Sequence, residues 1–256
     1  MKESERHIAA VVKALTIMEC LETHASLTLK EISTLTGLNK SRIIRLCGTL
    51  VSKSYLTHDS ATGKYSLGGK VLSLAKAYEK HNPLISLARP LLRALACSTG
   101  ETSALYVLDG WQRRCVAREE GQHPVRYASE IVGQSLALHA GASGKVLLAF
   151  GPEEIRQEVL RQDSLERFTP NTITDAKVLG VELQTIRTRG YAFSVGERVS
   201  EVAALAVPVF DYGKRLCAAL SIAGPIQRFS ANQCATSLAL LKKAAQQLSG
   251  QLGYKP

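Results

Sequence analysis

Basic and hydroxyl side chains repeat along one short stretch of the sequence, where they could contact the grooves and phosphates of DNA. Arg42, Arg45, Thr49 and Lys53 follow at offsets of 3, 7 and 11 residues, the spacing of one helix face. Residues 39–54 contain no acidic side chain. The stretch therefore predicts a DNA-recognition helix. The alternative is an ordinary solvated face, although such faces usually carry charges of both signs.

The candidate DNA-binding residues divide by their chemistry into two groups. Arginine can donate two hydrogen bonds to a guanine edge, so Ser41, Arg42 and Arg45 are the candidates for base contacts in the major groove. Lysine more often meets phosphates, which position a protein without specifying a sequence. The phosphate candidates and the expected N-cap of the helix complete the set: Lys40, Lys53, Lys64 and Asn39.

A second run of residues could bind an anion. Gly141, Ala142, Ser143 and Gly144 directly precede a predicted helix. Small side chains leave backbone N–H groups accessible, and the N-terminus of a helix attracts negative charge, so a bound carboxylate fits there. A tight turn that needs small residues only for packing explains the run equally well on spacing alone.

Two helices are expected before the recognition helix. Residues 7–23 carry apolar side chains at intervals of three and four, which predicts a helix with one buried face. Thr28 followed by Glu31 predicts a capping box for the second helix, with Ile32 and Leu35 pointing inward. Gly37 is expected to take the positive φ of a tight turn. The expected buried face of the first helix comprises Ile8, Val11, Val12, Leu15, Met18 and Leu21.

A hairpin and a linker are expected to follow the recognition helix. Residues 55–57 and 64–67 alternate like strands around the turn-rich residues 59–63, which predicts a β-hairpin. Helix, helix, turn, helix and hairpin make a winged helix-turn-helix over residues 1–69. Residues 70–82 are expected to form a linker helix, because Pro83 prevents its continuation.

The remaining residues, 83–256, are expected to form an α+β domain with a mostly antiparallel sheet. Strands are predicted over 102–108, 111–118, 124–132, 191–197, 203–210 and 216–223. Helices are predicted over 84–98, 141–150, 152–160, 174–189 and 229–252.

Composition narrows the class of protein. The net charge is +10, and residues 1–80 hold 12 Lys and Arg against 7 Asp and Glu, a basic balance that suits DNA. No apolar run approaches the roughly 18 residues of a membrane span, and the N-terminus lacks the core of a signal peptide, so a cytoplasmic location is expected. The six cysteines are spaced neither for metal nor for a redox pair. They are expected to be reduced and mostly buried, with no metal or cofactor.

The sequence resembles the IclR family of transcription regulators nearly from end to end. The N-terminal part carries LTLKEISTLTGLNKSRIIRLCGTLVSKSYLTHD and TGKYSLG, similar to the family's winged helix-turn-helix. The C-terminal part carries LALHAGASGKVLLAF, RTRGYAFSVGERVSEVAALAVPVFD and ALSIAGP, similar to its effector-binding domain. The resemblance implies a homo-oligomer, either a dimer or a dimer of dimers, that binds double-stranded operator DNA. It also implies a GAF-like C-terminal domain that binds a small organic effector, often in control of a catabolic operon.

The resemblance also implies effector-binding positions in this chain. The pocket would be formed by Ala142, Ser143 and Gly144, together with Ser194, Ala204, Ser221 and Ala223. Family members that bind small oxo-acids carry an acid, a cysteine and two serines at the last four positions. Because only one serine of that set is kept here, the wall is expected to be less polar and to suit a larger carboxylate or aromatic ligand. Arg42 stands where the family usually has a small polar residue, which predicts an operator preference of its own.

Two other classes of protein remain as alternatives. An enzyme with a DNA-binding appendage is disfavoured, because the sequence contains no G-x-S-x-G, H-E-x-x-H or Walker motif. A DNA-binding protein without an effector would explain the charge, but it leaves about 170 C-terminal residues without a role.

Overall fold

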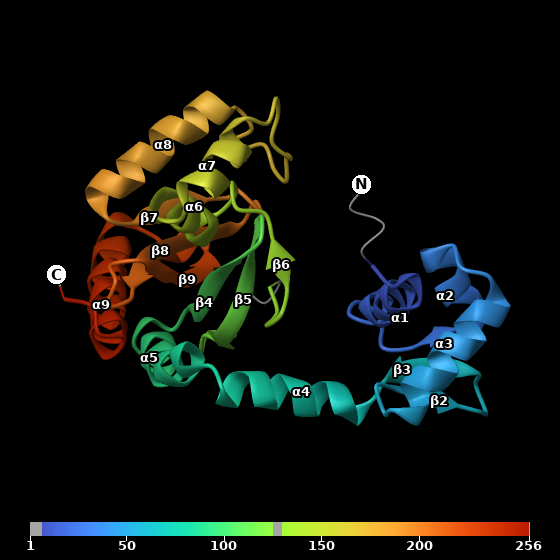
Figure 1. The fold of residues 1–256 in the computed structure, drawn as a ribbon. Helices are drawn as coiled ribbons and strands as arrows, with labels where there is room; N and C mark the ends of the chain where they lie inside the picture. The colour runs from blue at the N-terminus through green and yellow to red at the C-terminus, as the bar shows by residue number, and fades with distance from the viewer. Residues whose placement is uncertain (1–6, 125–129, 256) are drawn as a thin grey trace. The chain divides into compact units, whose positions relative to one another are not determined.

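The computed structural model describes residues 7–124 and 130–255, and the chain divides into two compact units (Figure 1). The first unit comprises residues 1–81 and the second residues 82–256. The expected start of the second domain at residue 83 lies one residue after the start of the second unit. Within the described parts of the chain, no helix is long and apolar enough to cross a membrane.

The N-terminal unit combines helices with a small antiparallel sheet. Its elements are α1 (Ala9–Cys20), β1 (Leu27–Thr28), α2 (Leu29–Thr36), α3 (Lys40–Ser52), β2 (Leu56–Asp59), β3 (Lys64–Leu67) and α4 (Gly69–Lys80). The strand order is β1-β3-β2. The expected winged helix-turn-helix is confirmed. The sheet has a third strand, β1, which was not predicted because a strand of two residues shows no alternation in the sequence. The core consists of Ile17, Leu21, Leu27, Ile32, Ile43, Cys47 and Leu56.

Local hydrogen bonds set the ends of α2 and α3. The Thr28 hydroxyl accepts from the Glu31 backbone N–H at 3.3 Å, and the Glu31 carboxylate accepts from the Thr28 backbone N–H at 2.7 Å. Gly37 ends α2 with a φ of 68°, a left-handed conformation that other residues rarely adopt. Asn39 caps α3 by accepting from the Arg42 backbone N–H at 3.0 Å. These three sequence predictions are confirmed.

The predicted buried face of α1 is confirmed only at its C-terminal end in the single chain. Leu21 is buried just after the helix and Met18 packs against the core, but α1 itself buries little. Its only fully buried side chain is Ile17, and four apolar side chains of the predicted face are 46–72% exposed. On α2, Ile32 is buried as expected, whereas Leu35 is 52% exposed. Periodicity identified an apolar stripe but not what covers it, because coverage depends on distant neighbours. The exposed stripe comprises Ile8, Val11, Val12 and Leu15.

The C-terminal unit is an antiparallel sheet between two helical layers (Figure 1). The strand order is β6-β5-β4-β9-β8-β7, and the α+β class with its antiparallel sheet is confirmed. The strands are β4 (Thr102–Asp109), β5 (Gln112–Glu119), β6 (Ser135–Leu136), β7 (Ala192–Val195), β8 (Val202–Phe210) and β9 (Leu216–Pro225). The helices are α5 (Pro83–Thr99), α6 (Ala142–Phe150), α7 (Glu153–Leu160), α8 (Ala176–Arg189), α9 (Ala231–Gln251) and a short 3₁₀ helix (Ile226–Arg228).

Side chains that alternate along the strands contribute to two separate hydrophobic cores, one on each face of the sheet. Leu105 and Val207 pack with α5 and α9 on one face of the sheet. Ala104, Tyr106 and Ala206 belong to the core on the other face, which α6, α7 and α8 cover. Because neighbouring side chains of a strand point to opposite faces, one sheet supports both layers.

The strand predicted over residues 124–132 is not supported. Residues 125–129 lie outside the described residues, and residues 130–132 are not in a strand. The edge strand is instead the two-residue β6, which pairs Leu136 with Arg113 and Ser135 with Arg114. A pairing of two residues leaves too little alternation for sequence reasoning to detect.

All six cysteines lie in the described residues and carry free thiols. The expectation that most are buried is wrong, since only Cys47 and Cys115 are buried while Cys97 is exposed. Burial raises the pKa of Cys47 to about 11 and that of Cys115 to about 12. Both buried thiols therefore stay protonated at neutral pH and serve as small apolar core residues.

Replacing Thr28 with alanine should destabilise α2 by about 1 kcal/mol, because the Glu31 backbone N–H loses its acceptor. Hydrogen exchange of the α2 amides measures the change. Thr34→Ala is the matched control, since Thr34 is exposed within the same helix and alanine favours helix formation there. Equal protection in the two variants would contradict a stabilising role for the capping box.

Candidate nucleic-acid interface and effector cavity

α3 separates an apolar back from a polar front. Ile43 and Cys47 are fully buried in the core of the N-terminal unit. The opposite face is exposed and comprises Ser41, Arg42, Arg45 and Thr49, continued by Lys53 at the C-cap, and Lys40 is exposed in the first turn. Since these side chains are held by a helix whose back is locked in the core, their positions relative to one another are set by the helix geometry. The arrangement presents two guanidinium groups, two ammonium groups and two hydroxyl groups to a partner of negative charge.

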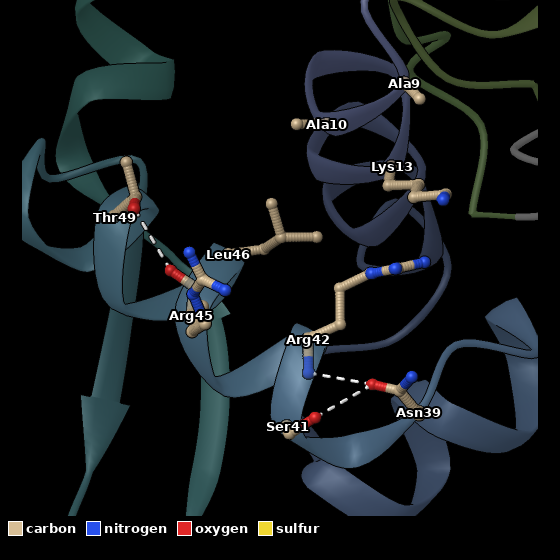
Figure 2. Close-up of a pocket in the computed structure, with 9 residues that line it drawn as sticks. All are labelled: Ala9, Ala10, Lys13, Asn39, Ser41, Arg42, Arg45, Leu46 and Thr49. Atoms are coloured by element: carbon tan, nitrogen blue, oxygen red, sulfur yellow. Dashed lines mark hydrogen bonds between the residues drawn. The ribbon is translucent and has the colours of Figure 1, made fainter.

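A hollow of about 480 Å³ lies between α1 and α3 (Figure 2). Asn39, Ser41, Arg42 and Arg45 line it from α3 and its N-cap. Leu46 and Thr49 also line it from α3, and Ala9, Ala10 and Lys13 line it from α1. Sequence reasoning missed Lys13 because it lies on another helix, 29 residues before Arg42. Lys13 therefore adds a cation from α1 to those that α3 exposes.

Two of the predicted DNA-binding residues have structural neighbours that shape their role. The Asn39 side-chain oxygen accepts from the Arg42 backbone N–H and from the Ser41 hydroxyl at 3.1 Å (Figure 2). This oxygen is therefore occupied by capping. Lys64 lies in β3 opposite Asp59 of β2. Lys64 is nonetheless exposed on the wing.

A second cavity lies in the C-terminal unit, between the sheet and the start of α6. Its free space is about 40 Å³, room for about three water molecules. Six of the seven positions predicted for effector binding line it. These positions come from three separate sequence blocks and meet at one point of the fold: Ala142, Ser143, Ser194, Ala204, Ser221 and Ala223.

Gly144, the seventh predicted position, is not among the lining residues. A Cβ atom there would lie 2.4 Å from the carbonyl oxygen of Leu138 and 3.1 Å from Arg113 Nη1. Close packing therefore explains this glycine, as the alternative for the small-residue run anticipated.

The first N–H groups near the start of α6 are already engaged within the protein. The Gly141 N–H donates to Glu197 Oε2 at 2.8 Å, and the Ala142 N–H donates to Ser194 Oγ at 3.1 Å. The N–H groups of Ser143 and Gly144 follow in the first turn, where no preceding helical carbonyl can accept them. The predicted anion site therefore has fewer free backbone N–H groups than the sequence suggested, because those of Gly141 and Ala142 are already bonded.

Charged side chains that sequence reasoning missed form much of the cavity wall. Arg113, Glu130, Glu197 and Arg198 all line it, beside Tyr106. The expectation of a less polar wall considered only part of the lining, which also carries these four charged side chains. It rested on four positions of the family pattern, whereas the charges come from β5 and from the loops before β6 and after β7.

Glu130 is the hub of this charged group. Its carboxylate accepts from the Tyr106 hydroxyl and from Arg113 Nη2 at 3.3 Å. Arg113 Nη1 donates in turn to Ser143 Oγ at 2.8 Å. Burial, followed by the negative charge of Glu130, raises the pKa of Tyr106 well above its usual value. Tyr106 therefore stays protonated at neutral pH and remains a donor.

A buried ion pair ties the loop after β7 to α6. Lys145 Nζ donates to Glu197 Oε1 at 2.5 Å and to Glu182 Oε1 at 3.4 Å. Glu182 also accepts from Arg189 at 3.0 Å. Two cations therefore balance two carboxylates. This network holds Glu197 and its neighbour Arg198 at the cavity.

Both parts of the chain match known protein families. A model of the bacterial transcriptional regulator IclR C-terminal domain matches residues 76–250, and a model of the IclR helix-turn-helix domain matches residues 10–60. The transcriptional regulator BhcR of Paracoccus denitrificans is 33% identical over 96% of this chain and 88% of its own length. KipR of Bacillus subtilis is 31% identical over 95% of this chain and 97% of its own.

Solved structures support the same relationship. The crystal structure of an IclR transcriptional regulator from Alicyclobacillus acidocaldarius matches with a TM-score of 0.87 at 29% identity. The match covers 96% of this chain and 100% of that chain.

Replacing Lys145 with methionine should destabilise the C-terminal unit by about 3 kcal/mol, because Glu197 is left buried without its main partner. Adding Glu197→Gln should recover most of the loss while keeping an acceptor for the Gly141 N–H. Urea unfolding followed by the fluorescence of Trp111 reports on this unit alone, because Trp111 is the chain's one tryptophan.

Arg161→Met removes a cation from an exposed pair with Glu158 and is the control, with an expected change within about 0.5 kcal/mol. Similar losses in Lys145→Met and Arg161→Met would show that the buried pair has no special weight.

Proposed function

The chain belongs to the IclR family of bacterial transcriptional regulators, and from this premise we propose that it binds operator DNA as an oligomer under the control of a small carboxylate. The named relatives are transcriptional regulators, so an enzyme with a DNA-binding appendage is set aside. The observation that carries the proposal is the exposed front of α3, which lies over a buried apolar back. A surface of this kind suits the major groove.

The proposed division of labour on DNA follows from side-chain chemistry. Arg42 and Arg45 reach base edges, where each bidentate contact discriminates by about 1–3 kcal/mol. Ser41 is small enough to lie close to the groove floor. The phosphate contacts, which carry affinity but not sequence, are assigned to Lys13, Lys40, Lys53 and Lys64.

Self-association is supported by apolar surface that the single chain leaves exposed. The stripe of α1 defined above contains four large apolar side chains. α4, which the structure describes in full, buries no side chain and exposes Leu72, Leu74 and Tyr78. A helix of this length is marginal by itself in water. A second copy of the chain would bury both surfaces and would present two α3 helices to half-sites about 34 Å apart, or a multiple of that spacing.

The proposed effector is a short-chain carboxylate. The cavity offers the Ser143 hydroxyl, the first turn of α6 and the Arg113 guanidinium as donors. Its small free space favours a short acid over the larger or aromatic ligand expected from the sequence. An effector that binds one oligomer geometry better than another shifts the population of DNA-binding states, with α4 as the proposed lever.

Fluorescence anisotropy with DNA from upstream of the protein's own gene tests the proposal, with random DNA as competitor and a panel of short acids as ligands. Salt-sensitive, sequence-specific binding that changes with one acid is the expected result. Specific DNA binding that no acid changes would favour a DNA-binding protein without an effector. Binding no tighter than to random DNA would count against regulation at this operator.

Arg42→Ala and Arg45→Ala should each lower operator affinity about 10- to 100-fold and leave binding to random DNA nearly unchanged, because they remove base contacts. Lys53→Ala should instead weaken both kinds of binding alike and reduce the slope of log K against log salt by about one. Anisotropy titrations at several salt concentrations separate these patterns. Uniform weakening by the arginine variants would remove them from base reading.

Leu15→Glu should shift the protein towards smaller assemblies, because a charge cannot be buried in an apolar interface without a large cost. Sedimentation velocity over a range of protein concentrations measures the shift. Thr34→Glu adds the same charge at an exposed site on α2 and should leave the assembly unchanged. An identical sedimentation profile for both variants would exclude the α1 stripe from the interface.

A further inference from the structure

Two guanidinium groups share one carboxylate at the wall of the effector cavity. Arg113 and Glu130 are buried, and the Arg198 side chain is 20% exposed. Arg113 Nη2 and Arg198 Nε each lie 3.3 Å from Glu130 Oε1. The other carboxylate oxygen, Oε2, accepts from the Tyr106 hydroxyl. Both oxygens of Glu130 therefore accept a hydrogen bond within this group, and its single negative charge is shared by two guanidinium groups.

Both arginines keep a buried donor without an acceptor. Among the described residues, no hydrogen-bond partner is present for Arg113 Nε or Arg198 Nε. Arg198 Nε is close to Glu130, but its geometry is not that of a hydrogen bond. Buried donors are satisfied in almost all native structures, so two orphan guanidinium N–H groups at one cavity point to an absent acceptor.

The charges at the cavity also indicate that a negatively charged acceptor is absent. Lys145 and Arg189 are balanced by Glu197 and Glu182 in the neighbouring network. Among the residues that the structure describes, Arg113 and Arg198 pair only with Glu130, which leaves one uncompensated positive charge beside the free space. Buried charge is stable only when paired, and a ligand with one negative charge would complete the pairing.

We propose that Arg113 and Arg198 bind a singly charged carboxylate and that Glu130 is a specificity-determining residue that excludes dicarboxylates. The inference rests on the carboxylate effector proposed above and adds its charge. A monocarboxylate would fill the two orphan donors and neutralise the site. A second carboxylate in so small a cavity would face Glu130, and like charges repel strongly where water is excluded.

The test uses pairs of acids matched in length, titrated into the full chain at constant ionic strength by calorimetry. The pairs are acetate and oxalate, propionate and malonate, and butyrate and succinate. In the unmodified protein, the monocarboxylate of the length that fits should bind at least tenfold more tightly than its dicarboxylate partner. Glu130→Gln keeps the side-chain shape and an acceptor for Tyr106. It should change the ratio of the two dissociation constants at least tenfold in favour of the dicarboxylate.

Two further variants keep the result interpretable. Glu158→Gln makes the same chemical change on the exposed surface of α7 and should leave the ratio unaltered. Arg198→Gln removes the uncompensated charge at a less buried position and should weaken monocarboxylate binding at least tenfold. It serves as the decisive variant if Glu130→Gln does not fold, as judged by circular dichroism.

The outcomes distinguish two claims: that the effector is a carboxylate, and that Glu130 selects monocarboxylates over dicarboxylates. Binding of dicarboxylates as tight as that of their partners, or a ratio unchanged in Glu130→Gln, would overturn charge selection and leave a carboxylate effector standing. The same holds if Arg198→Gln binds the monocarboxylate normally. Absence of binding by every acid to both the unmodified protein and Glu130→Gln would overturn the carboxylate effector and the selection together.

Discussion

Charge that is buried in the C-terminal unit must be paired, and the cavity proposed to bind the effector depends on this requirement. Glu197 connects the loop after β7 to α6, because its two carboxylate oxygens accept from Lys145 and from the Gly141 N–H. The backbone carbonyls of Gly196 and Glu197 accept in turn from the hydroxyls of Thr169 and Thr172. These bonds hold Arg198 against the cavity. Without them, the wall would lose both its shape and its charge.

The two candidate sites use charge in opposite ways. On α3 the cations are exposed, so water and salt screen them, and they suit a large, highly charged partner that is first attracted at a distance and then read by contact. In the cavity, Arg113 and Glu130 are buried, so each charge acts strongly over a short range and can distinguish ligands of a few atoms. The proposed affinity for DNA and the proposed selectivity for an effector thus have different physical origins in one chain.

The apolar surface of the N-terminal unit links its fold to its proposed assembly. α1 uses Ile17 to join the core and leaves a second apolar stripe uncovered, while α4 has no buried side chain. An amphipathic pattern indicates that a face will be covered, but it does not say by what. The stripe and α4 are therefore the surfaces that support the proposed self-association.

Much of the fold could be predicted from the sequence because its signals are local. The hydrogen bonds that set the helix ends span at most four residues and involve Thr28, Glu31, Gly37 and Asn39. In the strands, alternation of apolar and polar residues shows which side chains share a face. The family resemblance brought most of the small cavity residues together. Only the tertiary structure decided that Arg113, Glu130 and Arg198 meet there, since 85 residues separate the first from the last. No periodicity encodes which charges become neighbours, because burial and pairing depend on how the sheet and its loops close in space.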